Sequence, residues 1–493
     1  MPCTATIPNL TAREQAHYLY EAIPPGLFRV QDEADRIAWR VSPEPFALSK
    51  QQLDTIEGLG TDLLRFYRSL NNLYNRSVRG TAPGFIAEYL DQGKPEQVVK
   101  LQRQNRFKQD VPGVIRPDLI ITADGFAATE LDSIPGGMGF LGAMTEAYCQ
   151  LGHESAGGDH GIPAGFAAML RYVTAVEHPT VAIVVSEESA DYRNEMSWLA
   201  DALRRLGLAD AWVRAPQEVT FSEDGLFIRH EDGREARLDA LYRNFELFDL
   251  FNVPKQELML YAARHNRVRI VPAPKASLEE KLAFALLHHH ALATLWLNEL
   301  GKDVFERLLR LFPKTWVIDP RQMPPQGVVA GLEAGGAPVS DFRQLSTLPK
   351  SERAYVIKPS GFSQLAWGSR GVKIGDDLTR EEWNSAIEIA LTSYERTPYI
   401  LQRFHKGKLI RQSYFDRERD EIREYEGRVR LCPYYFVTGE ESVVLGGVLA
   451  TIAPADKKLI HGMTDAVMTS SILREPAGSW GSAGTSTQDV VKV

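Results

Sequence analysis

The most informative pattern of hydrophobic and polar positions lies in residues 116–133, where an apolar run (119–121) is followed by the turn signal Asp124-Gly125. A second extended segment follows the turn and ends in two carboxylates. This pattern predicts a β-hairpin. A three-residue turn that begins at Ala123, with Gly125 in the left-handed conformation, would determine the register of the two strands.

That register places Asp118 opposite Glu130 and Arg116 opposite Asp132. Because side chains alternate between the two faces of a strand, the four charged groups would share one face. A two-residue turn would instead put Asp118 on the other face. Three carboxylates close together repel one another unless a cation lies between them, and oxygen ligands suit magnesium. The hairpin therefore predicts a magnesium site; the alternative is a solvated hairpin with ordinary surface charges.

Elsewhere the pattern predicts helices before the hairpin and a mixture of strands and helices after it. A continuous apolar strand at 180–188 is followed by an amphipathic helix that ends at Gly207, which is the pattern of a parallel α/β unit. Residues 321–350 are rich in proline and glycine and predict a linker or a long surface excursion. Three capping boxes predict helix starts at Ser49–Gln52, Ser277–Glu280 and Thr379–Glu382.

Composition places the chain among globular proteins, with 493 residues, 44% hydrophobic and 24% charged. That length predicts two to four structural units, at about one per 150 residues. The net charge is −8 and no basic cluster stands out, which argues against a nucleic-acid partner. No apolar run of about 18 residues predicts a membrane span, and the N-terminus lacks the features of a signal peptide. Three scattered cysteines show no disulfide framework or metal-ligand spacing, so a cytoplasmic location is expected.

A lysine and a glycine-rich segment in the last third of the chain are candidates for binding phosphate. Lys358 ends a β-branched strand, from which its charge could reach a phosphate. Gly361, Gly368 and Gly371 follow, and glycines let backbone N–H groups approach phosphate oxygens without a Cβ in the way. The segment is not a Walker loop, because no G-x-x-x-x-G-K-[ST] pattern occurs. Gln402, on a later apolar strand, could line an adenine pocket; the alternative is a polar residue at a strand end.

A different candidate is the G-x-G-x-x-G pattern of Gly137, Gly139 and Gly142, which follows a strand and opens a helix. A dinucleotide site also needs a second strand with an acidic residue about 20 positions later, and a loop stands there instead. The pattern therefore favours a turn that leads the chain out of the hairpin. A dinucleotide-binding oxidoreductase that uses these glycines is kept as an alternative function.

Together these motifs resemble the ATP-grasp enzymes, specifically the circularly permuted branch that includes glutathionylspermidine synthase. In that branch the magnesium carboxylates precede the nucleotide-binding lysines along the chain. The family's arginine, aspartate, glutamate and asparagine match four positions here: Arg116, Asp118, Glu130 and Asp132. The segments PKTWVID, VIKPSGFSQLAWGSRGVKI and YILQRF resemble its nucleotide-binding strands and contribute three more: Lys314, Lys358 and Gln402.

The resemblance implies an ATP-dependent carboxylate–amine ligase that uses ATP and Mg²⁺. A carboxylate of a small molecule or peptide would attack the γ-phosphate to give an acyl phosphate and ADP, and an amine acceptor would then displace phosphate. The 361–371 loop would close over the phosphates and exclude water. The implied roles are metal ligation by Asp118, Glu130 and Asp132, phosphate binding by Lys314 and Lys358, and contact with the acyl phosphate by Arg116, shared with Arg430 or Arg428.

The implied fold is α/β, an ATP-grasp core in permuted order with an N-terminal helical layer and an inserted, preATP-grasp-like α/β domain. The expected parts are a helical region (1–110), the carboxylate hairpin and its helix (111–175), the α/β substrate-side domain (176–300), the nucleotide-binding part (301–475) and a flexible tail (476–493). Asp132 departs from the family asparagine, and no amidase domain is present, so the substrates of glutathionylspermidine synthase do not carry over. A catalytically degenerate ATP-grasp binding protein is the second alternative.

Overall fold

The computed structural model describes residues 7, 10–27, 39–230, 232–460 and 465–474, so the tail predicted at 476–493 lies outside the described residues. An eight-stranded, mainly antiparallel sheet forms the centre. Its strands are β1 (Arg40–Val41), β2 (Phe46–Leu48), β3 (Val114–Thr122), β4 (Gly125–Asp132), β18 (Leu409–Asp416), β19 (Glu421–Val437), β20 (Val443–Pro454) and β21 (Val467–Leu473). The main order is β1-β21-β20-β19-β3-β4, with β18 beside β19 and β2 beside β21.

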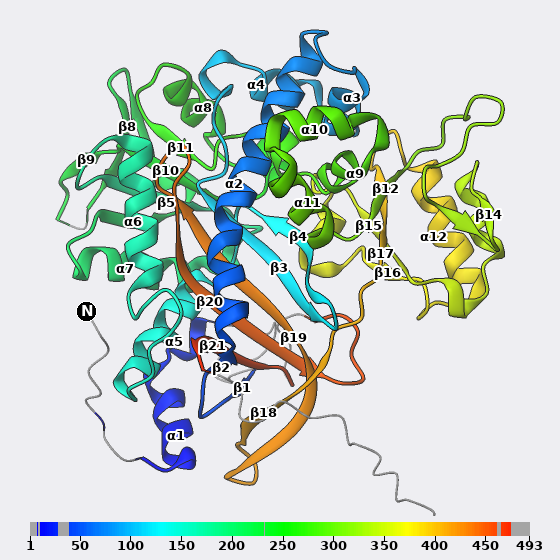
Figure 1. Cartoon of the computed structure of the whole chain (residues 1–493). Helices are drawn as coiled ribbons and strands as arrows, with labels where there is room; N and C mark the ends of the chain where they lie inside the picture. Colours follow the sequence, from blue (N-terminus) through cyan, green and yellow to red (C-terminus); the bar gives the residue numbers. More distant parts are fainter. Residues whose placement is uncertain (1–6, 8–9, 28–38, 231, 461–464, 475–493) are drawn as a thin grey trace, which may run out of the picture.

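Helices cover both faces of this central sheet (Figure 1). The long helix α2 (Lys50–Val78) crosses one face and contacts β3, β19 and β20. Helices α5 (Met138–Gln150) and α6 (Gly161–Thr174) pack on the other face, together with α1 (Ala12–Ala22). The remaining N-terminal helices are α3 (Phe85–Asp91) and α4 (Glu96–Gln102).

Two four-stranded sheets flank the centre. A parallel sheet has the order β11-β10-β5-β6, and an antiparallel sheet has the order β12-β17-β15-β16. The parallel strands are β5 (Thr180–Val185), β6 (Asp210–Arg214), β10 (Ala240–Asn244) and β11 (Arg269–Val271), with α7 (Arg193–Arg205) and α8 (Gln256–Arg264). The antiparallel strands are β12 (Thr315–Ile318), β15 (Tyr355–Pro359), β16 (Lys373–Ile374) and β17 (Tyr399–Arg403), with α12 (Arg380–Thr392). Smaller elements are β7 (Thr220–Ser222), β8 (Gly225–Arg229), β9 (Glu235–Arg237), β13 (Glu333–Ala334), β14 (Ala337–Pro338), α9 (Leu282–His288), α10 (Ala293–Leu300) and α11 (Lys302–Leu311).

Most of the helix and strand predictions are confirmed. The capping boxes at Ser49 and Thr379 both form, and β5 and β6 are parallel and joined through α7, as the strand–helix pattern predicts. The capping box predicted at Ser277 is wrong, because Ser277 lies inside a short 3-10 turn (Ala276–Leu278), α9 begins only at Leu282, and the Glu280 carboxylate accepts from Ser360 instead. Residues 321–350, predicted as a linker or a long surface excursion, are mostly exposed, and they also pack five buried side chains against the small sheet: Leu332, Val339, Phe342, Leu345 and Leu348.

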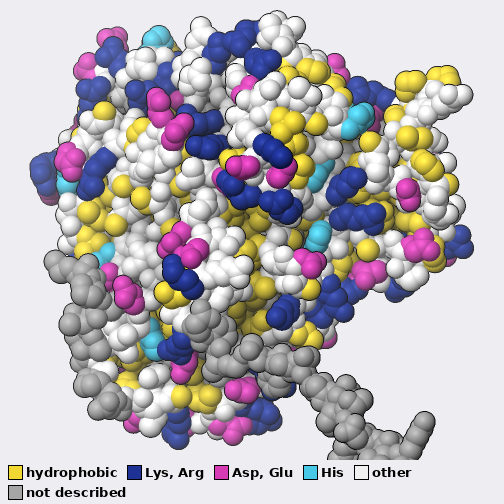
Figure 2. Space-filling view, in the orientation of Figure 1, with side chains coloured by type: hydrophobic (Ala, Val, Ile, Leu, Met, Phe, Trp, Pro, Cys, Tyr) yellow, Lys and Arg dark blue, Asp and Glu magenta, His cyan; other side chains and the backbone are white. Residues whose placement is uncertain are grey.

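Three further observations bear on the composition arguments. Within the described ranges, the helices include none that is both long and apolar enough to cross a membrane. Figure 2 shows basic and acidic side chains interspersed over the described part of one face. Cys432 is a free, buried thiol, whereas Cys149 is disulfide-bonded, which corrects the expectation that the cysteines carry no disulfide.

The charged end of the β3–β4 hairpin has the predicted register. Arg116 pairs with Asp132, and Asp118 pairs with Glu130. Because the strands alternate their side chains, these groups share one face of the sheet. The sequence prediction that brought the four charges together is therefore confirmed.

The turn of the hairpin, however, differs from the prediction. Thr122 pairs directly with Gly125, whose φ is +123°, so the loop has two residues rather than three. A β-bulge at Thr129 then adds one unpaired residue to β4 just before the charged end. A two-residue turn alone would put Asp118 on the other face from Glu130 and Asp132. A one-residue bulge moves the side chains that follow it to the opposite face, so Glu130 and Asp132 return to the face of Asp118.

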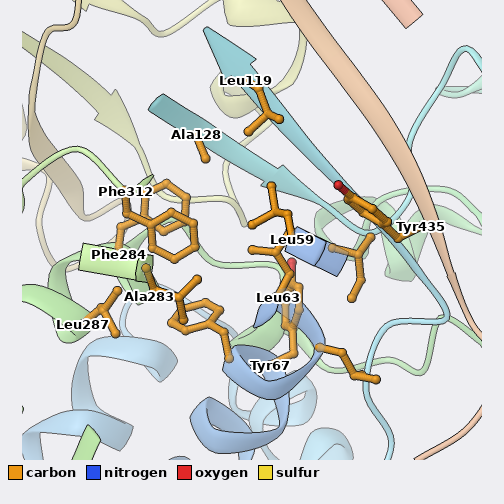
Figure 3. Close-up of a cluster of buried hydrophobic side chains, with 14 of the residues drawn as sticks. Leu59, Leu63, Tyr67, Leu119, Ala128, Ala283, Phe284, Leu287, Phe312 and Tyr435 are labelled. Carbon is orange, nitrogen blue, oxygen red and sulfur yellow. The ribbon is translucent and has the colours of Figure 1, made fainter. Parts of the chain in front are cut away.

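A hydrophobic core holds the opposite face of the hairpin in place (Figure 3). Leu119 and Ala128 are adjacent across the two strands and point into this core, where α2 and α9 supply the facing side chains. Those labelled in Figure 3 are Leu59, Leu63 and Tyr67 from α2 and Ala283, Phe284 and Leu287 from α9. Burial of the apolar face against two helices leaves the charged residues to face the other way.

Candidate functional site

A cavity of about 370 Å³ lies where the charged end of the hairpin meets the ends of β5 and β10 and the start of the 360–371 loop. Ligands of parallel sheets bind beyond the carboxyl ends of the strands, and this cavity occupies that position beside β5 and β10. Six of the predicted site residues line it: Arg116, Asp118, Glu130, Asp132, Gly361 and Arg430. The fold thus collects residues from three distant parts of the chain.

Asp118 is buried between the two arginines. Its Oδ1 accepts a hydrogen bond from Nε of Arg116 (3.1 Å), and its Oδ2 accepts one from Nη1 of Arg430 (2.9 Å). The thiol of Cys432 also donates to Oδ1 (3.4 Å). Burial raises the pKa of Asp118, but the two arginines outweigh burial and hold that pKa below its ordinary value. The carboxylate is therefore ionised, and its charge is balanced by protein side chains.

Asp132 and Glu130 are more accessible to the cavity, with side chains that are 27% and 35% exposed. Asp132 Oδ2 lies 3.0 Å from Nη2 of Arg116. Burial raises the pKa of Asp132, and the negative charges of Glu130 and Asp118 raise it further against the lowering effect of Arg116. A bound cation would relieve this repulsion.

The three carboxylates do not form a preassembled metal cage. Among the described residues, no group of three or more His, Cys, Asp or Glu side chains is arranged to hold a metal ion. The repulsion that the sequence argument assigned to a metal is instead offset by Arg116, Arg430 and Lys281. Glu130 and Asp132 nevertheless fit magnesium, because that ion commonly binds one or two carboxylates and completes its shell with water and phosphate oxygens.

Lys281 also lines the cavity, although it was not among the residues predicted from the sequence. It lies just before α9, and its Nζ donates to Oε1 of Glu130 (2.5 Å). Burial lowers the pKa of Lys281, but Glu130 more than offsets burial and the pKa lies above its ordinary value. Its sequence context, a charged residue opening an apolar helix, carried no signal of phosphate binding that could have singled it out.

Lys358 approaches the same corner from the small sheet. Its buried Nζ donates to the carbonyl oxygen of Thr129 (2.9 Å) and to Oε1 of Gln402 (2.9 Å). Gln402 is buried and donates its Nε2 to Oγ1 of Thr315 (3.2 Å), so it supports Lys358 from within the sheet. Burial lowers the pKa of Lys358 to about 8, Glu130 raises it, and the nearby Lys281 lowers it again.

The depressed pKa of Lys358 predicts a specific dependence of stability on pH. The native protein binds fewer protons at this residue than the unfolded chain between pH about 8 and the ordinary value of 10.5, so stability should rise with pH in that window. Relative to a Lys358→Met variant, the wild type should gain about 3 kcal/mol of unfolding free energy across the window. Urea unfolding at a series of pH values measures this; a constant difference would contradict it.

Lys314 does not join the other lysines. It is exposed, and its Nζ lies 5.5 Å from the ring centroid of Trp316. Thr315, one residue later, shares the face of the small sheet that carries Gln402 and Lys358, so strand alternation turns Lys314 toward the opposite face.

The predicted loop glycines have different surroundings. Gly361 lines the cavity, and a Cβ there would lie 2.0 Å from the carbonyl oxygen of Glu279. Gly371 donates its N–H to the carbonyl oxygen of Leu365 (2.8 Å) and also packs closely against its neighbours. Gly368 lies in a 3-10 turn (Gln364–Ser369) of the same segment.

The two candidate arginines of β19, Arg428 and Arg430, have different surroundings. Arg430 lines the cavity, and within the described part of the chain its Nε has no hydrogen-bond partner. Arg428 instead donates to the backbone carbonyls of Gly407 and Ala455. Of the two, Arg430 is the one that lines the cavity.

The G-x-G-x-x-G segment proves to be a packing motif. The N–H of Gly137 donates to both carboxylate oxygens of Glu195 (2.9 and 2.7 Å), so the start of α5 is bonded to a protein carboxylate. Burial raises the pKa of Glu195 to about 7, against the amides of Gly137 and Phe140, which lower it. A Cβ at Gly139 would lie 2.0 Å from the carbonyl oxygen of Glu195, which explains a glycine there through the close approach of α5 and α7.

The mixed α/β fold of the chain is similar to that of a solved structure. The apo structure of a glutathione synthetase-like effector, GSS30, from Globodera pallida matches with a TM-score of 0.55 and 11% identity, over 94% of this chain and 97% of that chain. At that identity the likeness shows a shared fold.

Other comparisons add little. A putative gamma-glutamylcysteine synthetase from Methylobacillus flagellatus KT matches with a TM-score of 0.39 and 11% identity, over 85% of this chain and 87% of that chain, and we draw no inference from it. No protein-family model matches the sequence, and no curated protein matches it either.

Proposed function

We propose that the protein is an ATP-dependent carboxylate–amine ligase of the circularly permuted ATP-grasp type. The observation that carries the proposal is that two lysines converge on the same short stretch of β4, at Thr129 and Glu130. Lys281 bonds Glu130, and Lys358 bonds the carbonyl of the preceding residue, although the lysines are 77 positions apart in the sequence. Two ammonium groups beside a partly exposed carboxylate suit a polyphosphate that carries a magnesium ion.

In the proposed reaction, a substrate carboxylate oxygen attacks the γ-phosphorus of ATP, and the bond to the bridging oxygen of ADP breaks. An amine nitrogen then attacks the acyl carbon, and inorganic phosphate leaves with the electron pair of the C–O bond. Lys281 and Lys358 would hold the phosphates and neutralise their charge. Magnesium, when bound by Glu130 and Asp132, would supply further neutralisation of phosphate charge.

Arg116 and Arg430 would contact the acyl phosphate. Asp118 bonds both guanidinium groups and would keep them at this end of the cavity. The unpartnered Nε of Arg430 would then be available to an anionic oxygen of the ligand. In this proposal Asp118 holds the two arginines, and magnesium would bind to Glu130 and Asp132 rather than to all three carboxylates.

Thermal unfolding with Mg-ATP, Mg-ADP and NAD tests the choice of ligand. At one hundred times its dissociation constant, a ligand that binds only the native state stabilises it by about 2.7 kcal/mol, which raises the melting temperature by several degrees. We expect this shift with both adenine nucleotides and none with NAD. Stabilisation by NAD alone would reject the proposal in favour of the oxidoreductase alternative.

Measuring ADP release over pools of small acids, peptides and amines would then identify the substrates. Nucleotide binding without ADP release in any pool would indicate a degenerate ATP-grasp protein.

A further inference from the structure

A fully buried ion pair lies beside the two lysines and outside the cavity wall. Nζ of Lys94 donates to Oε2 of Glu280 (2.7 Å), and both side chains are 0% exposed. Burial raises the pKa of Glu280, but Lys94, with Ser360 and Gly361, holds that pKa below its ordinary value, so the Glu280 carboxylate is charged. Burying two charges costs desolvation free energy that their attraction does not reliably offset. Stability alone is therefore a poor reason for the pair.

The carboxylate of Glu280 connects the segments that carry both lysines. Oε2 also accepts from the hydroxyl of Ser360, and Oε1 accepts from the backbone N–H of Gly361 (3.0 Å). Glu280 immediately precedes Lys281, and Ser360 follows Lys358 by two residues. One side chain thus bonds the loop that begins just after Lys358 while its own backbone leads directly into Lys281.

Both contacts require close backbone approaches. Gly361 can bring its N–H to Glu280 because it has no Cβ; a Cβ would lie 2.0 Å from the carbonyl oxygen of Glu279. Lys94, the other partner of the ion pair, follows Gly93, whose φ is +73°. A Cβ added at Gly93 would lie 2.5 Å from the carbonyl oxygen of Arg396. The turn that carries Lys94 is therefore held against the small-sheet region, and Lys94 reaches Glu280 from a defined position.

We propose that Lys94 and Glu280 are positioning residues, which hold Lys281 and the start of the 360–371 loop in a common geometry so that the two lysines converge on the same phosphates. The inference rests on the proposed function for its consequence in catalysis, because neither Lys94 nor Glu280 lines the candidate cavity. Charge-assisted hydrogen bonds are short and directional, so a buried carboxylate with several donors can determine the relative position of segments that apolar packing would leave adjustable.

The test is a Lys94→Met/Glu280→Gln double variant of the full chain. Removing both charges together leaves no uncompensated ion in the interior, so the variant should fold and melt within a few degrees of the wild type. Without nucleotide, hydrogen–deuterium exchange should accelerate in both peptides that cover residues 279–284 and 358–366. With nucleotide, KM for Mg-ATP should rise about tenfold or more, which corresponds to one lost hydrogen bond to a charged group.

A matched control removes a different ion pair. Arg307 donates two hydrogen bonds to Asp62 and joins α11 to α2 (2.7 and 2.8 Å). The Asp62→Asn/Arg307→Met variant should leave exchange in both peptides and KM for Mg-ATP unchanged. Unchanged exchange in the Lys94/Glu280 variant would overturn the positioning role. A wild type that neither binds Mg-ATP nor releases ADP would overturn the proposed function instead, and the exchange comparison would still decide whether the pair positions the two segments.

Discussion

Glu130→Gln is expected to reduce magnesium-dependent ADP release by about a hundredfold or more, the size of effect seen when one charge-stabilising group is removed from an active site. The substitution keeps the shape of the side chain and removes its charge. Glu130 is 35% exposed at the cavity and bonds Lys281, so the loss should affect both the proposed metal and the lysine that we propose binds phosphate. The concentration of Mg²⁺ that gives half-maximal rate should rise in parallel, because a neutral amide is a weaker ligand for a hard cation.

The fold should tolerate this substitution, since the residue is neither deeply buried nor part of the core under the hairpin. A matched control is Glu96→Gln, which removes a 79% exposed carboxylate that is also paired with a lysine, Lys100. We expect the control to keep wild-type ADP release and its wild-type Mg²⁺ dependence. Activity of the Glu130 variant within threefold of the wild type, at unchanged Mg²⁺ dependence, would mean that this carboxylate is only structural.

Lys281→Met should weaken binding of Mg-ATP by about a hundredfold, whereas Lys314→Met should leave it within about twofold. A charge-assisted contact to a phosphate contributes about 1.5–3 kcal/mol, and Lys281 is the lysine that lies beside Glu130. Lys314 is exposed and turned toward the other face of the small sheet, over Trp316. Isothermal titration with ADP and with a non-hydrolysable ATP analogue measures both variants.

This pair of variants separates the sequence prediction from the structural one. If Lys314→Met lost affinity and Lys281→Met retained it, the nucleotide would have to bind on the outer face of the small sheet, and the proposed site would be wrong. Lys281→Arg is a useful third variant, because it retains the charge while changing the donor geometry. We expect it to bind Mg-ATP better than Lys281→Met and less tightly than the wild type.

The hairpin shows how much of the site was predictable. Charged residues at matched positions before and after a turn implied a shared face, and the pairs Arg116–Asp132 and Asp118–Glu130 have that register. The predicted register is right, but the predicted three-residue turn is wrong, because the structure has a two-residue turn and a bulge at Thr129 instead. A bulge depends on the packing of both faces of a strand, and a single strand's pattern does not show it.

Lys358 and Lys281 show more clearly how far the sequence alone can identify residues of the site. Lys358 was identifiable because a β-branched strand and a glycine-rich segment flank it. Lys281 had no such local context, and it enters the site only because α9 packs beneath the hairpin. The glycines at 137–142 are the opposite case, because their spacing matched a nucleotide motif while the loop that follows them already favoured a simple turn. The structure agrees with the turn, and its N–H at Gly137 is bonded to Glu195.

The sequence by itself determined the alternation of elements, the charged face of the hairpin and the strand that carries Lys358, because each follows from the local period of side chains along the backbone. Tertiary structure alone decided which cations neutralise the carboxylates, which lysine stands beside Glu130, and how Glu280 joins the two lysine-bearing segments. Those contacts link residues up to 312 positions apart, as between Asp118 and Arg430. They exist only where packed helices and sheets bring distant backbones within hydrogen-bonding distance.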